Sequence, residues 1–117
     1  MPDIEIVRSH VALEHLRDLA EGLFGDLVKA VVDVERGLMA IGGDLHADEE
    51  ALLIGDGPAQ ADLWGINLYP GEHPADDWIE FDSMINVRPR QGNRSGSVED
   101  AGTRGRIVEL VGALVKS

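Results

Sequence analysis

Apolar and polar residues alternate along five stretches of the chain, and this two-residue period is typical of β-strands with one buried face. The stretches are residues 4–8, 27–35, 38–41, 63–69 and 78–87. Only Arg36 and Gly37 separate the second stretch from the third. Because glycine readily adopts the positive φ of a tight turn, these two stretches are predicted to form a hairpin.

Apolar residues recur at three- and four-residue intervals in two other stretches, which predicts amphipathic helices. The first helix is expected over residues 11–23, with Ser9 as its capping residue. The second is expected to follow Ser97 as its cap, with Asp100 in the reciprocal position of a capping box. Its apolar stripe consists of Ile107, Leu110, Val111, Leu114 and Val115. Residues 47–53 fit either a short helix or a further strand.

The resulting order is β-α-β-β-(α)-β-β-α, in which hairpin-like connections dominate. Such an order favours an α+β domain rather than a parallel sheet. We therefore expect a single domain over residues 1–117, with a mainly antiparallel sheet of four to five strands and two main helices packed on one face. At 117 residues with 44% hydrophobic content, the chain can bury a core without disulfides.

Composition restricts the environment and the partners. The chain has no cysteine, which excludes disulfides and thiolate metal sites. It has no basic and apolar leader and no apolar stretch near 20 residues, so a soluble, untargeted, cytoplasmic protein is expected. A net charge of −12 and only five aromatic residues argue against nucleic-acid binding and against anionic membrane surfaces.

The charge is divided along the chain. Residues 1–87 contain 19 acidic and 4 basic residues, whereas residues 88–117 contain 3 acidic and 6 basic residues. Three of the arginines fall within residues 88–94, between the longest expected strand and the last helix. An arginine cluster in an acidic protein must either pair internally or bind an external anion.

The segment 88–97 is therefore a candidate site for a small anionic ligand. It precedes an expected helix N-terminus, which offers unpaired N–H groups, and its arginines offer planar donors for carboxylate or phosphate. The candidate ligand-binding residues are Asn86, Arg88, Arg90, Asn93, Arg94 and Ser95. The alternative is that the arginines pair with acids of the same chain or of a second subunit in a homodimer.

A second candidate site surrounds His46, which stands among four carboxylates. Asp44, His46 and Asp48 are candidate ligands for Mg²⁺, Mn²⁺ or Zn²⁺, and Glu50 would face His46 if residues 47–53 are helical. The alternative is a solvated helix face with acids at its N-terminus. Apart from this divalent metal, no cofactor is expected.

Catalytic residues are less well defined. No cysteine, GxSxG or SxxK nucleophile is present. His46 and Asp82 are candidate general bases if folding brings them into one pocket. In the expected strand 78–87, Glu80, Asp82 and Asn86 share a face with Arg88, which is either a polar cleft or the ordinary solvated face of a sheet.

Three sequence stretches together resemble an uncharacterised family of small bacterial and archaeal proteins, a domain of unknown function. They are VVDVERGLMAIGGDLHAD (31–48), DLWGINLYP (62–70) and IEFDSMINVRPRQGNRS (79–95). The resemblance covers nearly the whole chain and implies a compact prokaryotic cytosolic protein. It implies no reaction, ligand or catalytic residue.

Three functions follow as hypotheses, and the sequence does not decide whether the protein is an enzyme. The leading one is a small-ligand domain that binds an anionic group at residues 88–97. The second is a metal-assisted hydrolase that uses Asp44, His46 and Asp82. The third is a structural or interaction protein that self-associates through its arginine segment.

Overall fold

The alternating stretches assemble into one antiparallel sheet. The computed structural model describes residues 4–57 and 60–117. The sheet consists of β1 (Glu5–Val7), β3 (Val28–Asp33), β4 (Leu38–Ile41), β5 (Leu63–Leu68) and β6 (Ile79–Glu80). Their spatial order is β1-β4-β3-β5-β6, with every neighbouring pair antiparallel. The predicted α+β class is confirmed.

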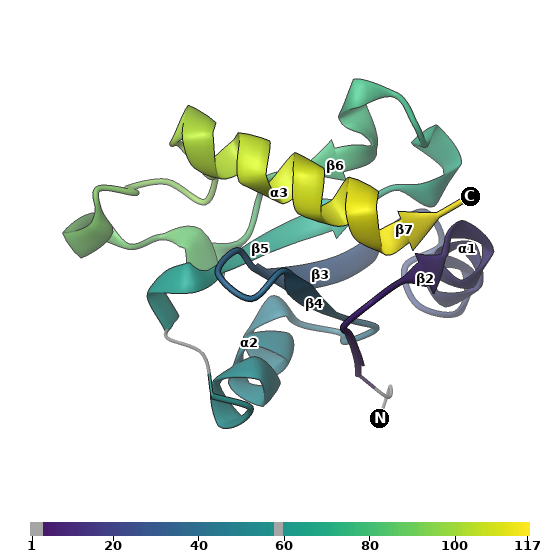
Figure 1. Ribbon diagram of the computed structural model, residues 1–117, viewed down its shortest axis with the longest axis horizontal. Helices are drawn as coiled ribbons and strands as arrows, with labels where there is room; N and C mark the ends of the chain where they lie inside the picture. Colours follow the sequence, from purple (N-terminus) through teal and green to yellow (C-terminus); the bar gives the residue numbers. More distant parts are fainter. Residues whose placement is uncertain (1–3, 58–59) are drawn as a thin grey trace.

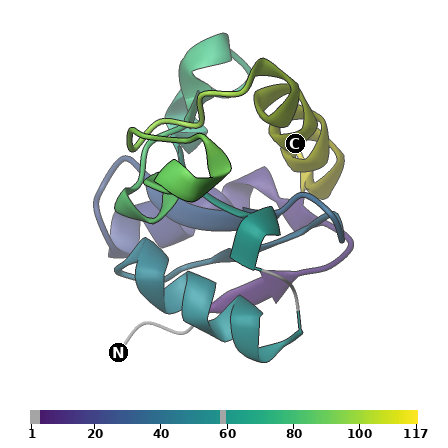
Figure 2. The same cartoon turned by 90° about the vertical axis from the view of Figure 1, so that its left-hand side faces the viewer.

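Helices cover both faces of this sheet (Figure 1, Figure 2). On one face lie α1 (Leu13–Gly22) and α3 (Ala101–Leu114), and on the other lies α2 (His46–Gly55). The structure thus has three helices among its described residues, where two main helices were expected. A short parallel pair, β2 (Val11–Ala12) and β7 (Val115–Lys116), joins the start of α1 to the end of α3. Single 3₁₀ turns occupy Gln60–Asp62, Pro70–Glu72, Asp76–Trp78, Met84–Asn86 and Pro89–Gln91.

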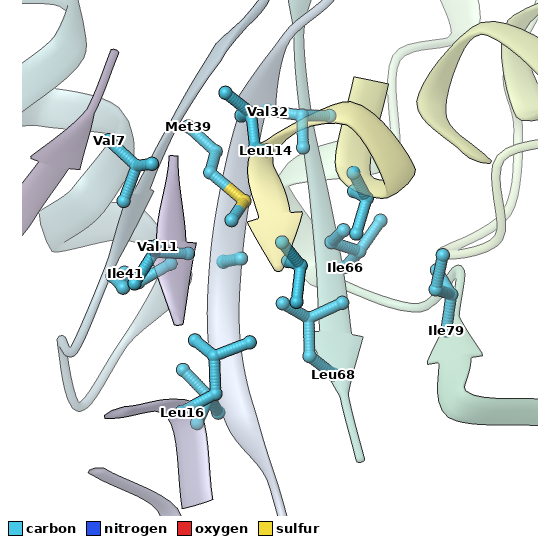
Figure 3. Close-up of a cluster of buried hydrophobic side chains, with 14 of the residues drawn as sticks. Val7, Val11, Leu16, Val32, Met39, Ile41, Ile66, Leu68, Ile79 and Leu114 are labelled. Carbon is cyan, nitrogen blue, oxygen red and sulfur yellow. The ribbon is translucent and has the colours of Figure 1, made fainter. Parts of the chain in front are cut away.

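The larger core lies between the sheet and the pair α1 and α3 (Figure 3). Every second residue of the strands points into it, as the alternation predicts. Its buried members include Val7, Leu16, Val32, Met39, Ile41, Ile66, Leu68, Ile79 and Leu114. Burial of this many aliphatic side chains makes this face the main source of stability.

The α2 face carries a smaller apolar cluster and several polar groups. The cluster consists of Val31, Leu38, Ala40, Leu53 and Leu63. By alternation the same face also carries Lys29 and Asp33 of β3 and Asn67 of β5. The underside of α2 adds His46 and Glu49, both buried. The two faces of the sheet are therefore chemically different.

The hairpin between β3 and β4 is confirmed, although its loop is longer than two residues. Asp33 ends β3 and its side-chain oxygen accepts hydrogen bonds from the amides of Glu35 and Arg36, both at 3.0 Å. Gly37 adopts φ +69° before β4 begins. An aspartate turn thus replaces the expected turn centred on Arg36 and Gly37 alone.

The helical prediction for residues 47–53 is confirmed, because α2 covers them. The predicted caps are wrong. Ser9 lies before β2 and no side chain caps α1. Asp100, rather than Ser97, caps α3, and its carboxylate accepts a hydrogen bond from the Thr103 amide at 2.8 Å.

The prediction of one long strand over residues 78–87 is also wrong. The strand β6 ends at Glu80, and the chain then passes over the α2 face at Gly65. The Asn86 side chain takes the place of a strand there: its Oδ1 accepts from the Gly65 amide at 2.8 Å, and its Nδ2 donates to the Gly65 carbonyl at 2.9 Å. Asn86 is fully buried, so its amide completes the edge of β5.

Among the described residues, none of the helices combines the length and apolarity required to span a membrane.

The crossing at Gly65 gives a stability prediction. A Cβ at this position would lie 2.5 Å from Ser83 Cβ and 2.6 Å from Ser83 Oγ. Gly65→Ala should therefore lower the free energy of unfolding by about 3 kcal/mol, as other overpacked sites do. Denaturant titration monitored by circular dichroism measures this.

Gly105→Ala is the matched control, because nothing lies within 4 Å of a Cβ there and the position is inside α3. It should raise stability by roughly 0.5–1 kcal/mol through helix propensity. Adding Ser83→Gly to Gly65→Ala should restore part of the loss. Equal stability of Gly65→Ala and the wild type would show that the crossing is not as tight as described.

Candidate functional site

A cleft of about 380 Å³ opens between the first turn of α2 and the segment that follows β6. We call it the α2 cleft; its lining consists of residues 27 and 29, 45–47, 67 and 82–85. In Figure 2 α2 lies below the sheet, and Ser83 and Ile85 of the segment after β6 reach the same face of the sheet at Gly65. His46 and Asp82, the two residues singled out as candidate bases, thus line one cavity.

His46 is held by the sheet beneath it. Its Nε2 lies 2.7 Å from the backbone oxygen of Ile66. A carbonyl oxygen only accepts hydrogen bonds, so Nε2 carries the proton. Burial lowers the pKa of His46, and the positive charge of Lys29 lowers it further, against opposing effects of Ile66, Asn67 and Asp82. The ring is therefore neutral near pH 7 and Nδ1 has a free lone pair.

No hydrogen bond reaches Nδ1 from the part of the chain that the structure describes. Nδ1 therefore has a lone pair that no described residue uses, in a side chain that lines the α2 cleft. His46 is consequently a fixed acceptor of a hydrogen bond or a proton.

Asn67 lines the cleft and is 8% exposed. It pairs in register with Lys29 on β3 and with Glu80 on β6. Its Nδ2 donates to Glu80 Oε1 at 2.7 Å and to the Asp82 carbonyl at 3.3 Å, which fixes the orientation of the amide. Its Oδ1 is buried and receives no hydrogen bond from a described residue. The Asn67 side chain acts on His46 as a hydrogen-bonding group, which favours the protonated form of His46 and so raises its pKa, against the larger effect of burial.

The remaining walls combine charge and apolar surface. Asp82 is exposed at the mouth, where its segment pairs with Ser97 through an isolated bridge. Lys29 also lines the cleft, and its Nζ lies 5.0 Å from the ring centroid of Phe24. The apolar lining consists of Leu27, Leu45, Ala47, Met84 and Ile85. Met84 is 84% exposed and forms the outer rim.

Glu49 lies one turn after His46 and is completely buried between α2 and the sheet. Its Oε2 accepts a hydrogen bond from the Gly43 amide at 3.0 Å, while Oε1 is buried without a partner among the described residues. Burial raises the pKa of Glu49 to about 9. It is therefore a neutral carboxylic acid at pH 7.

The predicted metal ligands do not gather. Asp44 and Asp48 are exposed and do not line the α2 cleft, and Glu50 points to Arg88 rather than to His46. Within residues 4–57 and 60–117, no three histidine or acidic side chains form a group that could hold a metal ion. Metal binding stays a prediction that the described geometry does not favour.

Arg88, the first residue of the predicted anion site, is engaged by the protein itself. Its guanidinium donates to the carbonyls of Ile85, Gln60 and Leu63 and forms an ion pair with Glu50 at 3.4 Å. It also lies 4.8 Å from the ring centroid of Trp64. Burial lowers its pKa.

Three more of the predicted ligand-binding residues are occupied within the chain. Asn86 completes β5, as described above. Asn93 is buried and donates to the carbonyls of Asn86, Ser95 and Ser97. Ser95 donates through both its amide and its hydroxyl to Glu99 Oε2, at 2.7 and 2.8 Å.

Glu99, which follows the segment 88–97, accepts hydrogen bonds from it. Its Oε2 also accepts from the Arg94 amide at 2.9 Å, and the hydrogen bonds from Ser95 lower its pKa most. Arg90 and Arg94 are exposed, and neither makes an ion pair with a described residue. The segment thus has hydrogen-bond donors, as the sequence suggested, and the Glu99 carboxylate accepts from the amides of Arg94 and Ser95 and from the Ser95 hydroxyl. Binding of an external anion stays a prediction.

Lys29 and Asn67 are two residues of the cleft that the sequence prediction missed. Each is a polar residue inside a mostly apolar strand, and their register places them side by side. A polar residue at a position that alternation assigns to a covered face was the available signal. Without the position of α2, that face could not be recognised as covered.

A family model described as Protein of unknown function (DUF5674) matches residues 5–114. The match confirms the resemblance seen in the sequence. No curated protein and no solved structure matches the chain.

Glu49 predicts an unusual dependence of stability on pH. Its pKa is about 9 in the folded protein and about 4.3 in an unfolded chain. The unfolded state therefore loses its proton first, and stability falls as pH rises through this window. Glu49→Gln removes the loss and should raise the free energy of unfolding by about 4 kcal/mol at pH 7.5.

Chemical denaturation of Glu49→Gln and wild type at several pH values tests this. The two proteins should differ little near pH 4 and increasingly above it. Glu21→Gln in α1, an exposed position, is the control and should follow the wild type. A constant difference at all pH values would contradict a raised Glu49 pKa.

Glu99 gives a direct test of the anion hypothesis. Glu99→Ala leaves the amides of Arg94 and Ser95 without their carboxylate, so inorganic phosphate should bind there in the variant and not in the wild type. NMR titration that follows these two amides measures phosphate binding, and Glu109→Ala is the control variant. Equal phosphate binding by the wild type would instead support the open anion site predicted from the sequence.

Proposed function

Because the chain belongs to the family Protein of unknown function (DUF5674), we propose its function from its own geometry: the protein binds a small ligand in the α2 cleft. The observation that carries this proposal is the Asn67 Oδ1 atom. The atom is buried, its residue lines the cleft, and no described residue donates to it.

An acceptor in this state is costly for the fold. Burying a polar atom without a partner costs about 1–3 kcal/mol. A leucine at position 67 would avoid this cost, because its side chain has no polar atom to bury. A group that donates to Oδ1 from within the cleft would remove the cost, and a bound ligand supplies such a group.

The dimensions and walls of the cleft support a small molecule. Ligand sites typically enclose about 300–1,000 Å³ and combine apolar walls with a few polar groups. The α2 cleft has a volume of about 380 Å³, with aliphatic side chains around His46, Asn67 and Asp82. Its walls come from α2, from the sheet and from the segment after β6, so the fold holds them in place.

His46 adds proton chemistry to binding. Its Nε2–H is fixed on the Ile66 carbonyl, and Nδ1 is left to accept from a ligand in the cleft. A neutral, oriented imidazole is the usual general base at neutral pH. The same arrangement that binds a ligand could therefore accept its proton.

The other hypotheses have less geometric support. In the arginine segment 88–97, backbone carbonyls engage Arg88 and Glu99 engages Ser95, whereas Arg90 and Arg94 stay exposed. A metal-assisted hydrolase would need Asp44 beside His46 and Asp82, and Asp44 does not line the cleft. Self-association through Arg90 and Arg94 stays a prediction without a structural observation in its favour.

A pair of matched variants tests ligand binding. Ala47 and Ala51 are both exposed on α2, but only Ala47 lines the cleft. In ¹H–¹⁵N NMR spectra, some members of a collection of small amines, alcohols, amides and carboxylates should shift the signals of His46, Asn67 and Ile85. Ala47→Leu should abolish these shifts because it fills the cleft, and Ala51→Leu should preserve them.

Two results would contradict the proposal. One is that no compound in the collection shifts the cleft residues of the wild type. The other is that Ala47→Leu folds normally and still binds the same compounds with unchanged affinity.

A further inference from the structure

The polar groups of the α2 cleft differ in kind, and the difference indicates which ligand fits. Asn67 Oδ1, His46 Nδ1 and the Asp82 carboxylate all accept hydrogen bonds. The donors of Asn67 are already used by Glu80 and by the Asp82 backbone. Lys29 is the only charged donor of the lining. Acceptors therefore outnumber donors in the cleft.

More carboxylates than ammonium groups lie around the cleft. Asp82 lines it, and Glu80 lies directly beside Asn67, with 2.7 Å between Glu80 Oε1 and Asn67 Nδ2. Against these two carboxylates stands Lys29, whose ammonium lies over the Phe24 ring at 5.0 Å. The whole chain has a net charge of −12. Two carboxylates thus stand against one ammonium around the cleft, although Lys29 has a larger effect on the pKa of His46 than Asp82 has.

Resting on the proposed function, we infer that the ligand of the α2 cleft is a primary amine in its ammonium form, carried on a small apolar body. An ammonium group has three N–H donors and no acceptor, which suits a lining in which His46, Asn67 and Asp82 all carry acceptors. Its positive charge is balanced by Asp82. The apolar body contacts Leu45, Met84 and Ile85, which line the same cavity.

Other polar groups match less well. An alcohol supplies only one donor, so it leaves acceptors of the cleft unpaired. A carboxylate supplies no donor and would face Asp82, a like charge. Failure to pair buried polar groups is the strongest source of discrimination between similar ligands. The cleft should therefore separate amines from alcohols and acids of equal length.

A series of butyl compounds tests the inference by NMR titration at pH 7.5. Butylammonium should bind in the cleft with roughly tenfold higher affinity than 1-butanol, and butanoate should not bind detectably. Butyltrimethylammonium has the charge without N–H donors and should bind more weakly than butylammonium. A result in which butanol or butanoate binds as tightly as butylammonium would overturn the inference.

Two variants that each remove one carboxylate distinguish a direct effect of Asp82 on amine binding from an effect of the overall charge of the protein. Asp82→Asn removes the carboxylate at the cleft, and it should lower butylammonium affinity by roughly tenfold. Asp44→Asn makes the same change at an exposed site outside the cleft and should leave the affinity unchanged. Equal affinities of the two variants would show that Asp82 does not bind the amine.

The outcomes distinguish this inference from the function on which it rests. If alcohols or amides bind in the cleft and Ala47→Leu blocks them, while butylammonium does not bind, the amine inference is wrong and the ligand site stands. If no compound shifts His46, Asn67 or Ile85, both are wrong.

Discussion

The contact between Asn86 and Gly65 is the constraint on which the rest of the α2 face depends. One carboxamide replaces a strand at the edge of β5 and satisfies both backbone groups of Gly65. Gly65 has no side chain, so Ser83 can pass directly over it. Together these features stop β6 after two residues and carry the chain across the sheet towards α2. Without this crossing there would be no wall opposite the first turn of α2, and therefore no cleft.

The two faces of the sheet divide stability and chemistry between them. The face under α1 and α3 holds most of the buried aliphatic side chains and explains why the fold is stable. The face under α2 has a smaller apolar cluster and buries His46, Glu49 and Asn67. Buried polar groups lower stability unless they are paired, and two of these three have an oxygen without a partner among the described residues. The buried polar groups of the α2 face thus lower the stability of the fold, and the same groups are available to bind a ligand.

Much of the fold could be predicted from local patterns, since β3, β4 and β5 alternate and α3 has a clear apolar stripe. Residues 78–87 alternate equally well, but the sequence does not show that Asn86 folds back on Gly65 instead of continuing the ladder. The same limit applies to the candidate site. His46 and Asp82 were identified by residue type and meet in one cleft, whereas Lys29 and Asn67 become visible only through strand register. The arginine segment was recognised as rich in donors, but the use of Glu99 as its acceptor depends on a turn that spacing does not reveal.

Ligand binding in the α2 cleft depends most directly on the state of one ring. His46 must be neutral, with its proton on Nε2 and an unused lone pair on Nδ1. Long-range ¹H–¹⁵N correlation spectra of the ¹⁵N-labelled protein report both ring nitrogens directly. We predict a neutral His46 with a protonated Nε2 and an unprotonated Nδ1 at pH 7. A proton on Nδ1, or a doubly protonated ring at this pH, would contradict the account.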